Sequence, residues 1–163
     1  MLKKFSLILI ILVLLFGLNS CYTYTPPQQA KRITKTQLYD LSYNAVWTSL
    51  VEFFAINSLP LDILDKDSGL ISTKDFKIKG LNWCDCGNWK DMGGEFEIKD
   101  KYGAHLEFNI FVKEKNGNIK VLINMTYRGV DKNLTGMAQG GYDGICYSTG
   151  ELENMIFDYI KNN

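Results

Sequence analysis

Residues 103–130 read GAHLEFNIFVKEKNGNIKVLINMTYRGV, and this stretch decides the fold, because its apolar residues alternate with polar ones on both sides of a turn. Alternation with a period of two places one set of side chains on a single face of a β-strand. That set comprises Ala104, Leu106, Phe108, Ile110, Val112, Ile119, Val121, Ile123, Met125 and Tyr127. Asn116-Gly117, between the two runs, is a strong hairpin signal. The stretch therefore predicts two long antiparallel strands with one buried face.

Shorter strands are expected before this hairpin. Residues 31–40 are a weak first strand, and residues 61–76 predict a pair of strands joined by the turn DKDSG. The acidic residues of that turn lack the full ligand set of a calcium loop. The segment GEFEIKD predicts another strand, with Phe96 and Ile98 pointing inward.

Two helices are expected to cover the apolar face. The first begins after Ser42, a residue type that caps helices, and it ends before Pro60. The second begins at residues 148–151, Ser-Thr-Gly-Glu, which have the pattern of a capping box. Between the long hairpin and this second helix, residues 131–147 are Gly-rich and aperiodic, so they predict a loop.

Together these elements predict an α+β fold with a single antiparallel sheet of about five to six strands and two helices packed on one face. The expected chain order is β-α-β-β-β-β-β-α, which is similar to that of a helix-grip domain. We expect one domain over residues 31–163, with a cysteine-containing insertion at about residues 80–93.

Residues 43–73 read YNAVWTSLVEFFAINSLPLDILDKDSGLIST and resemble the repeated unit of BamC-like lipoproteins. In that family a Trp-bearing helix leads into a hairpin whose turn has the pattern Asp-x-x-x-Gly-x-Ile. The matching positions here are Trp47, Asp65, Gly69 and Ile71. These are packing and turn residues, so the resemblance implies a fold and no active site.

The expected insertion contains the stretch LNWCDCGNW, residues 81–89, and a further cysteine, Cys146, precedes the last helix. Outside the cytoplasmic membrane, thiols tend to pair. We expect a disulfide between Cys86 and Cys146, with Cys84 as the alternative partner, because Gly87 gives the backbone at Cys86 more freedom. Closing a loop of about 60 residues would favour folding by roughly 4 kcal/mol.

Other interpretations of this stretch stay open. A Cys84–Cys86 bond would close a tight, redox-active ring, and His105 would be needed for zinc bound by three thiolates or for a cysteine nucleophile. Cys-x-Cys is not the usual zinc spacing, and the alternation places His105 on the solvated side of its strand. The sequence thus predicts no metal, no cofactor and no enzymatic activity. Trp83 and Trp89 either cover the underside of the insertion or, if exposed, form a contact site for a partner.

Residues 1–21, MLKKFSLILIILVLLFGLNSC, have the pattern of a secretory signal, with two lysines, an apolar run and a small residue before Cys21. The run is shorter than the about 20 apolar residues of a membrane span. The tetrapeptide LNSC resembles a bacterial lipobox, which implies cleavage before Cys21 and acylation, palmitate included, of that cysteine. An ordinary signal or an N-terminal anchor helix is the alternative.

The lipobox resemblance also implies a location. In Gram-negative sorting, Asp directly after the lipidated cysteine retains a lipoprotein at the inner membrane, and this chain has Tyr22 there. We therefore expect a lipid-anchored protein of the bacterial cell envelope, at the outer membrane and facing the periplasm. Residues 21–30 would then be the lipidated cysteine and a flexible tether.

Charge and composition bear on the partners. Removing residues 1–20 leaves 143 residues with 16 basic and 18 acidic side chains, and no basic face stands out. Nucleic acid is therefore not an expected partner. We expect a non-enzymatic interaction or assembly-accessory module that contacts the membrane through the lipid on Cys21 and binds another envelope protein. The alternative is a binder of a small apolar ligand between the sheet and the C-terminal helix, which Phe96, Phe108, Ile123 and Ile156 would leave little room for.

Overall fold

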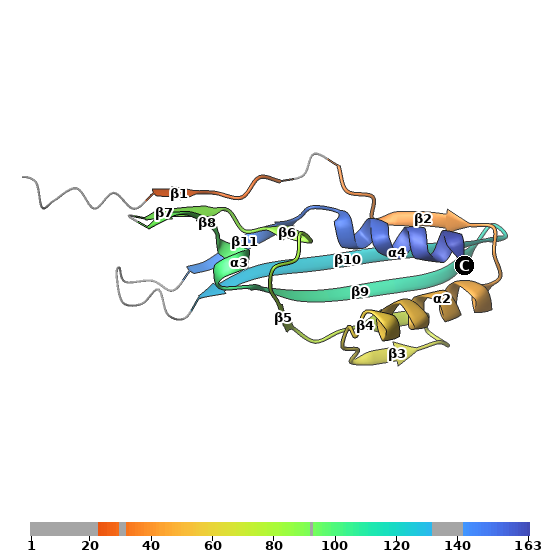
Figure 1. Ribbon diagram of the computed structural model, residues 1–163. Coiled ribbons are helices and arrows are strands. Elements are labelled where there is room, and N and C mark those ends of the chain that lie inside the picture. Colours follow the sequence, from red (N-terminus) through yellow and green to blue (C-terminus); the bar gives the residue numbers. More distant parts are fainter. Residues whose placement is uncertain (1–22, 30–31, 92, 132–141) are drawn as a thin grey trace, which may run out of the picture.

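The computed structural model describes residues 23–29, 32–91, 93–131 and 142–163 (Figure 1). Its elements in chain order are β1 (Thr23–Thr25), β2 (Thr36–Tyr39), α2 (Tyr43–Ile56), β3 (Ile63–Asp65), β4 (Leu70–Ser72), β5 (Phe76–Ile78), β6 (Cys84–Asp85), β7 (Asn88–Asp91), β8 (Gly94–Glu97), α3 (Ile98–Lys101), β9 (Ala104–Lys115), β10 (Asn118–Asp131), β11 (Tyr142–Ser148) and α4 (Glu151–Asn162). The signal at residues 1–20 and Cys21 lie outside the described residues. None of the described helices is long and apolar enough to cross a membrane.

The protein is α+β, and its main sheet is antiparallel with eight strands in the described chain. The long strands β9 and β10 form its centre. Strand β10 pairs with β2 near the turn end and with β11 at the other end, while β4 and β5 pair with β9. Strands β3 and β6 extend the sheet outward from β4 and β11.

The prediction of a single sheet is wrong, because β1, β7 and β8 form a separate three-stranded sheet. Phe96 lies in β8 of this small sheet, where it is half-buried and paired with Trp89, rather than between the main sheet and a helix. Ile98 was expected in the same strand but begins α3, and its side chain is buried there. Strand alternation within four residues could not show which sheet the segment joins.

The predicted long hairpin is confirmed. Of the ten residues assigned to its inner face, all are buried except Met125, which is half-buried. The turn uses Asn116 and Gly117 with φ of 53° and 76°. Positive φ at both central residues gives the turn a twist that matches that of the strands, which explains why Asn-Gly occupies it.

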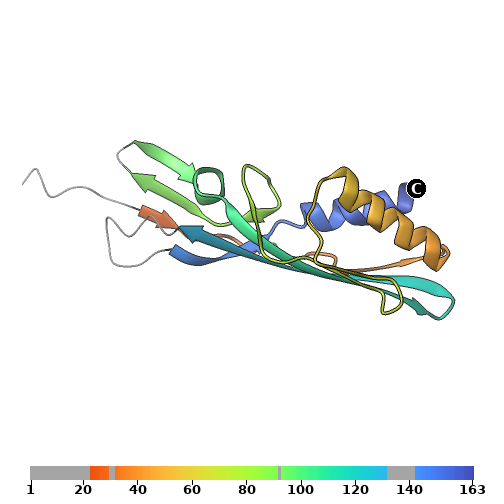
Figure 2. The same cartoon turned by 90° about the horizontal axis from the view of Figure 1, so that it is seen from below.

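Both helices pack on one face of the main sheet and against each other (Figure 2). Ser42 caps α2 as predicted, since its hydroxyl accepts a hydrogen bond from the amide of Ala45 at 3.1 Å. Phe54 of α2 stacks on Phe108 of β9, with ring centroids 5.1 Å apart. The Tyr39 hydroxyl of β2 donates to the carbonyl of Phe157 at 3.0 Å and ties the sheet to α4.

The predicted capping box before α4 is wrong. The N-cap is Gly150, in a left-handed conformation with φ of 86°, and no side chain caps the helix. The Ser148 hydroxyl instead donates to the Glu153 carboxylate at 2.8 Å and accepts from the Gly150 amide at 3.0 Å. Glu153 is 2% exposed, so its need for a donor takes Ser148 away from the helix start.

Two segments expected to lack regular structure contain strands. Residues 142–148, part of the expected loop, form β11 and pair with β10, whereas residues 132–141 lie outside the described residues. In the expected tether, Thr23–Thr25 forms β1 and pairs with β7. Neither segment shows a clear apolar alternation, so each is a strand because a neighbouring strand offers free hydrogen-bonding groups.

Candidate functional site

The cysteine insertion lies against the chain that leads into α4 (Figure 1). Strand β6 pairs with β11, so that Asp85 is opposite Tyr147 and Cys84 is opposite Ser148. Further along, the amide of Thr149 donates to the carbonyl of Trp83 at 3.1 Å, and its hydroxyl donates to the carbonyl of Asn82. Backbone pairing therefore positions the insertion before any covalent link is considered.

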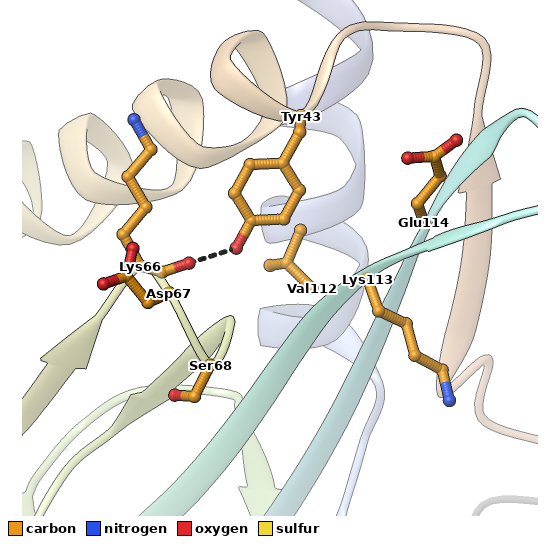
Figure 3. A pocket seen from close by; sticks show the side chains of 7 residues that line it. All are labelled: Tyr43, Lys66, Asp67, Ser68, Val112, Lys113 and Glu114. Carbon is orange, nitrogen blue, oxygen red and sulfur yellow. Dashed lines mark hydrogen bonds between the residues drawn. The ribbon is translucent and has the colours of Figure 1, made fainter.

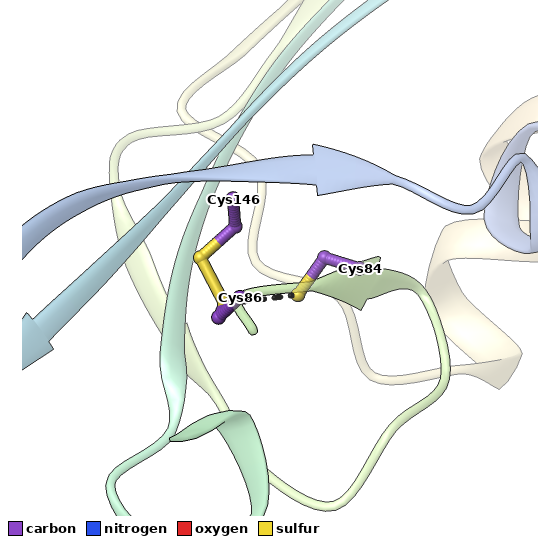
Figure 4. Close-up of side chains that lie close together, drawn as sticks. All are labelled: Cys84, Cys86 and Cys146. Atoms are coloured by element: carbon purple, nitrogen blue, oxygen red, sulfur yellow. Dashed lines mark hydrogen bonds between the residues drawn. A yellow bond between two sulfur atoms is a disulfide. The ribbon is translucent and has the colours of Figure 1, made fainter. Parts of the chain in front are cut away.

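Cys86 and Cys146 form a disulfide between residues 60 apart in the sequence (Figure 4). This is the pair that the sequence favoured. Their Cα atoms are 4.2 Å apart. The register of β6 on β11 explains the choice of partner, because it carries Cys86 to the position opposite Cys146 and leaves Cys84 opposite a serine.

Cys84 has no disulfide partner and is 1% exposed. Its Sγ lies 3.8 Å from that of Cys86, and the Sγ atoms of Cys84, Cys86 and Cys146 all lie within 4.8 Å of one another (Figure 4). Burial raises the pKa of the Cys84 thiol to about 11, with the Lys99 ammonium opposing this rise and Asp85 adding to it. At neutral pH the thiol is protonated, which makes it a weak nucleophile.

Asp85, between the two cysteines, organises the backbone around them. One carboxylate oxygen accepts from the Gly87 amide at 2.7 Å, and the other accepts from the Gln28 amide at 2.9 Å. Gly87 has φ of 81°, and a Cβ there would lie 2.4 Å from the Thr25 carbonyl oxygen. Glycine is needed at this position both for its conformation and for the close approach of β1.

The two tryptophans of the insertion have different environments. Trp83 is 8% exposed and packs in the core, so it presents little surface to a partner. Trp89 is half-buried in the small sheet, where its ring lies 5.7 Å from that of Tyr24 in β1. Of the two interpretations, covering the underside of the insertion fits Trp83, and Trp89 mainly joins strands of the small sheet.

His105 does not join the cysteines. Its Nδ1 lies 2.5 Å from a carboxylate oxygen of Asp75, and Arg128 contacts the other oxygen at 3.3 Å. Because His105 pairs with Arg128 and Tyr127 with Leu106, the register puts His105 on the sheet face opposite the buried residues. Neither zinc bound by three thiolates and His105 nor a Cys–His nucleophile is therefore assembled.

The face of the main sheet opposite the helices is uncovered in the described chain (Figure 2). By strand register, its large apolar residues are Leu38, Ile63, Leu70, Phe111, Leu122 and Ile145. Four of these side chains are exposed, at 54% for Leu38, 41% for Ile63, 41% for Phe111 and 68% for Ile145. Leu122, Phe111 and Leu70 lie directly opposite one another on β10, β9 and β4, and we call these three residues the apolar row.

The apolar row is the candidate functional feature that sequence reasoning missed. On the solvent side of the long hairpin, Phe111 and Leu122 interrupt an otherwise polar series, and that interruption was the available signal. The two residues belong to different strands, so only the pairing register shows that they are neighbours.

Two surface depressions of the described chain bear on ligand binding. The larger, of about 620 Å³, is open to solvent and is lined by Tyr43, Lys66, Asp67, Ser68, Val112, Lys113 and Glu114 (Figure 3). Tyr43 is held at its wall by donating to the Lys66 carbonyl at 2.7 Å. Most of its lining is polar or charged with both signs, which does not suit an apolar ligand.

The second depression, of about 400 Å³, runs along β10, β11 and the start of α4. Arg32, Ile33, Ile145 and Glu153 are among its lining residues. The interior between the sheet and α4 is filled by Phe108, Ile123 and Ile156, which are all 0% exposed. These three residues belong to the buried core.

No protein-family model matches the chain, and the search of curated proteins finds no match.

Proposed function

We propose that this chain is a lipid-anchored bacterial envelope protein, of BamC-like, helix-grip type, that acts as a non-enzymatic interaction or assembly-accessory module. Its uncovered sheet face docks on another envelope protein. The observation that carries this proposal is the apolar row of Leu70, Phe111 and Leu122, with exposed Leu38, Ile63 and Ile145 on the same face.

An antiparallel sheet with one solvated face normally alternates apolar-in and polar-out. Here the solvated face carries a phenylalanine that is 41% exposed between two half-buried leucines. Aromatic residues are enriched in the buried centres of protein interfaces, whereas charged residues are depleted there. Charged residues such as Lys113 and Lys120 flank the row in the register and would form a polar rim.

The non-enzymatic character is supported by the state of the reactive groups. Cys84 is buried and protonated at neutral pH, and Cys86 and Cys146 are joined to each other. His105 interacts with Asp75 on the sheet face opposite the buried residues. His105 and the three cysteines lie on opposite faces of the sheet, so a base and a thiol do not converge on a common site, as the partners of an acid–base or nucleophilic mechanism must.

The disulfide is compatible with an oxidising compartment. If Cys21 is acylated, only Tyr22 separates it from β1, so the small sheet would lie within about 10 Å of the lipid attachment. The domain would then sit close to the lipid head groups. The anchor is tested by Cys21→Ser, which is expected to abolish palmitate incorporation and to leave the chain out of the outer-membrane fraction.

The docking face is tested with a matched pair of substitutions, Ile145→Asp and Ile56→Asp. Both isoleucines are 68% exposed, but Ile145 lies on the uncovered face and Ile56 ends α2 on the helix side. A photocrosslinking residue at position 111 of the full chain in membranes is expected to give a specific adduct with an envelope protein. Ile145→Asp should reduce that adduct at least tenfold, and Ile56→Asp should leave it intact.

Equal effects of the two substitutions, or the lack of any position-specific adduct at Phe111, would remove the sheet face as the docking surface. Circular dichroism of both variants checks that each retains the fold.

A further inference from the structure

Three cysteine sulfurs are gathered at one buried point by the backbone. Cys84 and Cys86 are two residues apart along an extended segment, so their side chains point to the same side of it. Cys146 reaches the same point from β11 (Figure 4). The three residues are 1%, 1% and 4% exposed, and their Sγ atoms all lie within 4.8 Å of one another.

We infer that, once the Cys86–Cys146 bond is reduced, Cys84, Cys86 and Cys146 bind a single Cu(I) ion through three thiolates. Two sulfurs bound to one metal at about 2.3 Å lie about 3.8–4.0 Å apart. The Sγ atoms of Cys84 and Cys86 are 3.8 Å apart, which is the spacing of two such ligands. Cys146 needs only to separate from Cys86 to complete a triangle around the metal.

The available ligands favour Cu(I) over zinc. Thiolates are soft ligands that select Cu(I) or zinc, and structural zinc almost always takes four ligands. Among the described residues, only three cysteines form the cluster. The nearby Asp85 carboxylate is held by two backbone amides, and His105 lies on the other face of the sheet. The cluster therefore offers three soft ligands and no fourth.

A nearby lysine partly offsets the negative charge of the metal-bound cluster. Loss of three thiol protons to one Cu(I) leaves two net negative charges in a buried position. Lys99 is 7% exposed, and its ammonium favours the thiolate form of Cys84. It is held by Asn82 and Glu97, each at 2.9 Å. A positioned cation beside a metal thiolate site lowers the cost of its charge.

Reduction of the disulfide and binding of Cu(I) are two separate steps, and atoms and electrons balance in each. A dithiol reductant transfers two electrons and two protons to the disulfide, becomes a disulfide itself, and leaves thiols on Cys86 and Cys146. Cu(I) then replaces the protons of all three thiols. Direct exchange by Cys84 is less well placed. With a disulfide bond of about 2.0 Å, a linear attack on Cys86 would put the outer sulfurs about 5.8 Å apart, beyond the 4.8 Å limit observed.

The test uses the purified full chain in detergent, with Cys21→Ser in every sample so that only three cysteines remain. The chain with the intact cluster and the chain with Cys84→Ala are each reduced with a dithiol, which is then removed under anaerobic conditions. Both are titrated with Cu(I) in competition with a chromophoric chelator. We expect one tightly bound Cu(I) per chain with the intact cluster and at least tenfold weaker binding for Cys84→Ala. X-ray absorption should show three sulfur neighbours around copper.

Cys84→Ala is a useful control because it keeps the Cys86–Cys146 bond in the oxidised protein. The oxidised chain should bind no Cu(I) tightly. The assignment would be overturned if the two reduced chains bound Cu(I) with equal affinity. It would also be overturned if the reduced intact cluster bound no stoichiometric Cu(I), whether or not circular dichroism shows that chain to be folded. Tighter binding of Zn(II) than of Cu(I) would overturn the choice of metal.

Discussion

The helix-covered part of the main sheet and the cysteine insertion are stabilised in different ways. In the first, α2 and α4 bury a continuous apolar layer against β9 and β10. In the second, residues 80–91 are held by two residues of β6 pairing, by the pairing of β7 with β1 and β8, by a disulfide and by hydrogen bonds to Asp85 and Thr149. The difference shows that burial sustains a long regular element, whereas a short irregular segment depends on a few specific links.

This contrast predicts where the chain is sensitive. In the helix-covered part, removing a side chain leaves a cavity that close-packed neighbours cannot fill. In the insertion, removing a link releases the segment while the rest of the sheet keeps its own contacts. The four substitutions below test this contrast in order of expected effect.

The largest effect is expected for Phe54→Ala. Phe54 is 1% exposed and stacks on Phe108 with centroids 5.1 Å apart. Loss of the ring should lower the free energy of unfolding by about 3–5 kcal/mol, a large share of a typical total. Urea unfolding followed by circular dichroism measures it. A loss below about 1 kcal/mol would show that burial there is not what holds the two layers together.

The next effect is expected for the double substitution Cys86→Ala with Cys146→Ala. Removing a link that closes a 60-residue loop should cost about 2–4 kcal/mol. Proteolytic cleavage should then appear first within residues 80–91, with the long hairpin still protected. Cys84→Ala, which retains the link, is the control. Simultaneous loss of protection in both regions would mean that they do not differ as described.

A smaller effect is expected for Ser148→Ala, at the junction of the two regions. The substitution leaves the Glu153 carboxylate, 2% exposed, without the hydroxyl that donates to it at 2.8 Å. The unfolding free energy should fall by about 1–3 kcal/mol. Adding Glu153→Leu to this variant should recover part of the loss. If the second substitution lowers stability further, the buried carboxylate has another donor.

The smallest effect is a pH dependence that Cys84 causes. Its pKa is raised from 9.0 to about 11 in the folded chain, mainly by burial. The folded state therefore favours the protonated thiol, and this stabilisation is complete below about pH 9 and is lost as the pH rises toward 11. Relative to Cys84→Ala, the wild-type chain should lose about 1 kcal/mol of stability by pH 10. Parallel curves for the two chains from pH 8 to 11 would contradict this origin.

The sequence predicted the elements whose pattern is repeated over many residues. In β9 and β10, five inward-facing apolar residues alternate with outward-facing ones on each side of Asn116-Gly117. Helix α2 has both an apolar stripe and a capping serine. Such signals are local, because each residue's environment follows from its position in the same element. Strands β1, β6, β7 and β11 were not predicted, and each pairs with a strand from a distant part of the chain.

The same division applies to the candidate sites. The sequence favoured Cys86 over Cys84 as the disulfide partner because of Gly87, and the register of β6 on β11 gives the structural reason for that pairing. The apolar row depends on the register between β9, β10 and β4. The failed capping box at Ser148 has a similar origin, because the buried carboxylate of Glu153, in the first turn of α4, binds its hydroxyl.

The amino-acid sequence by itself therefore determined the long hairpin, the two helices, the apolar face that joins them and the set of cysteines available for pairing. The sequence also favoured Cys86 over Cys84 as the partner of Cys146, which the structure bears out. Tertiary structure alone decided which tryptophan is hidden and which apolar residues meet on the uncovered face. The physical reason is the sequence distance over which each interaction acts. Periodicity and capping act between residues a few positions apart, whereas strand register and burial depend on residues brought together from distant parts of the chain.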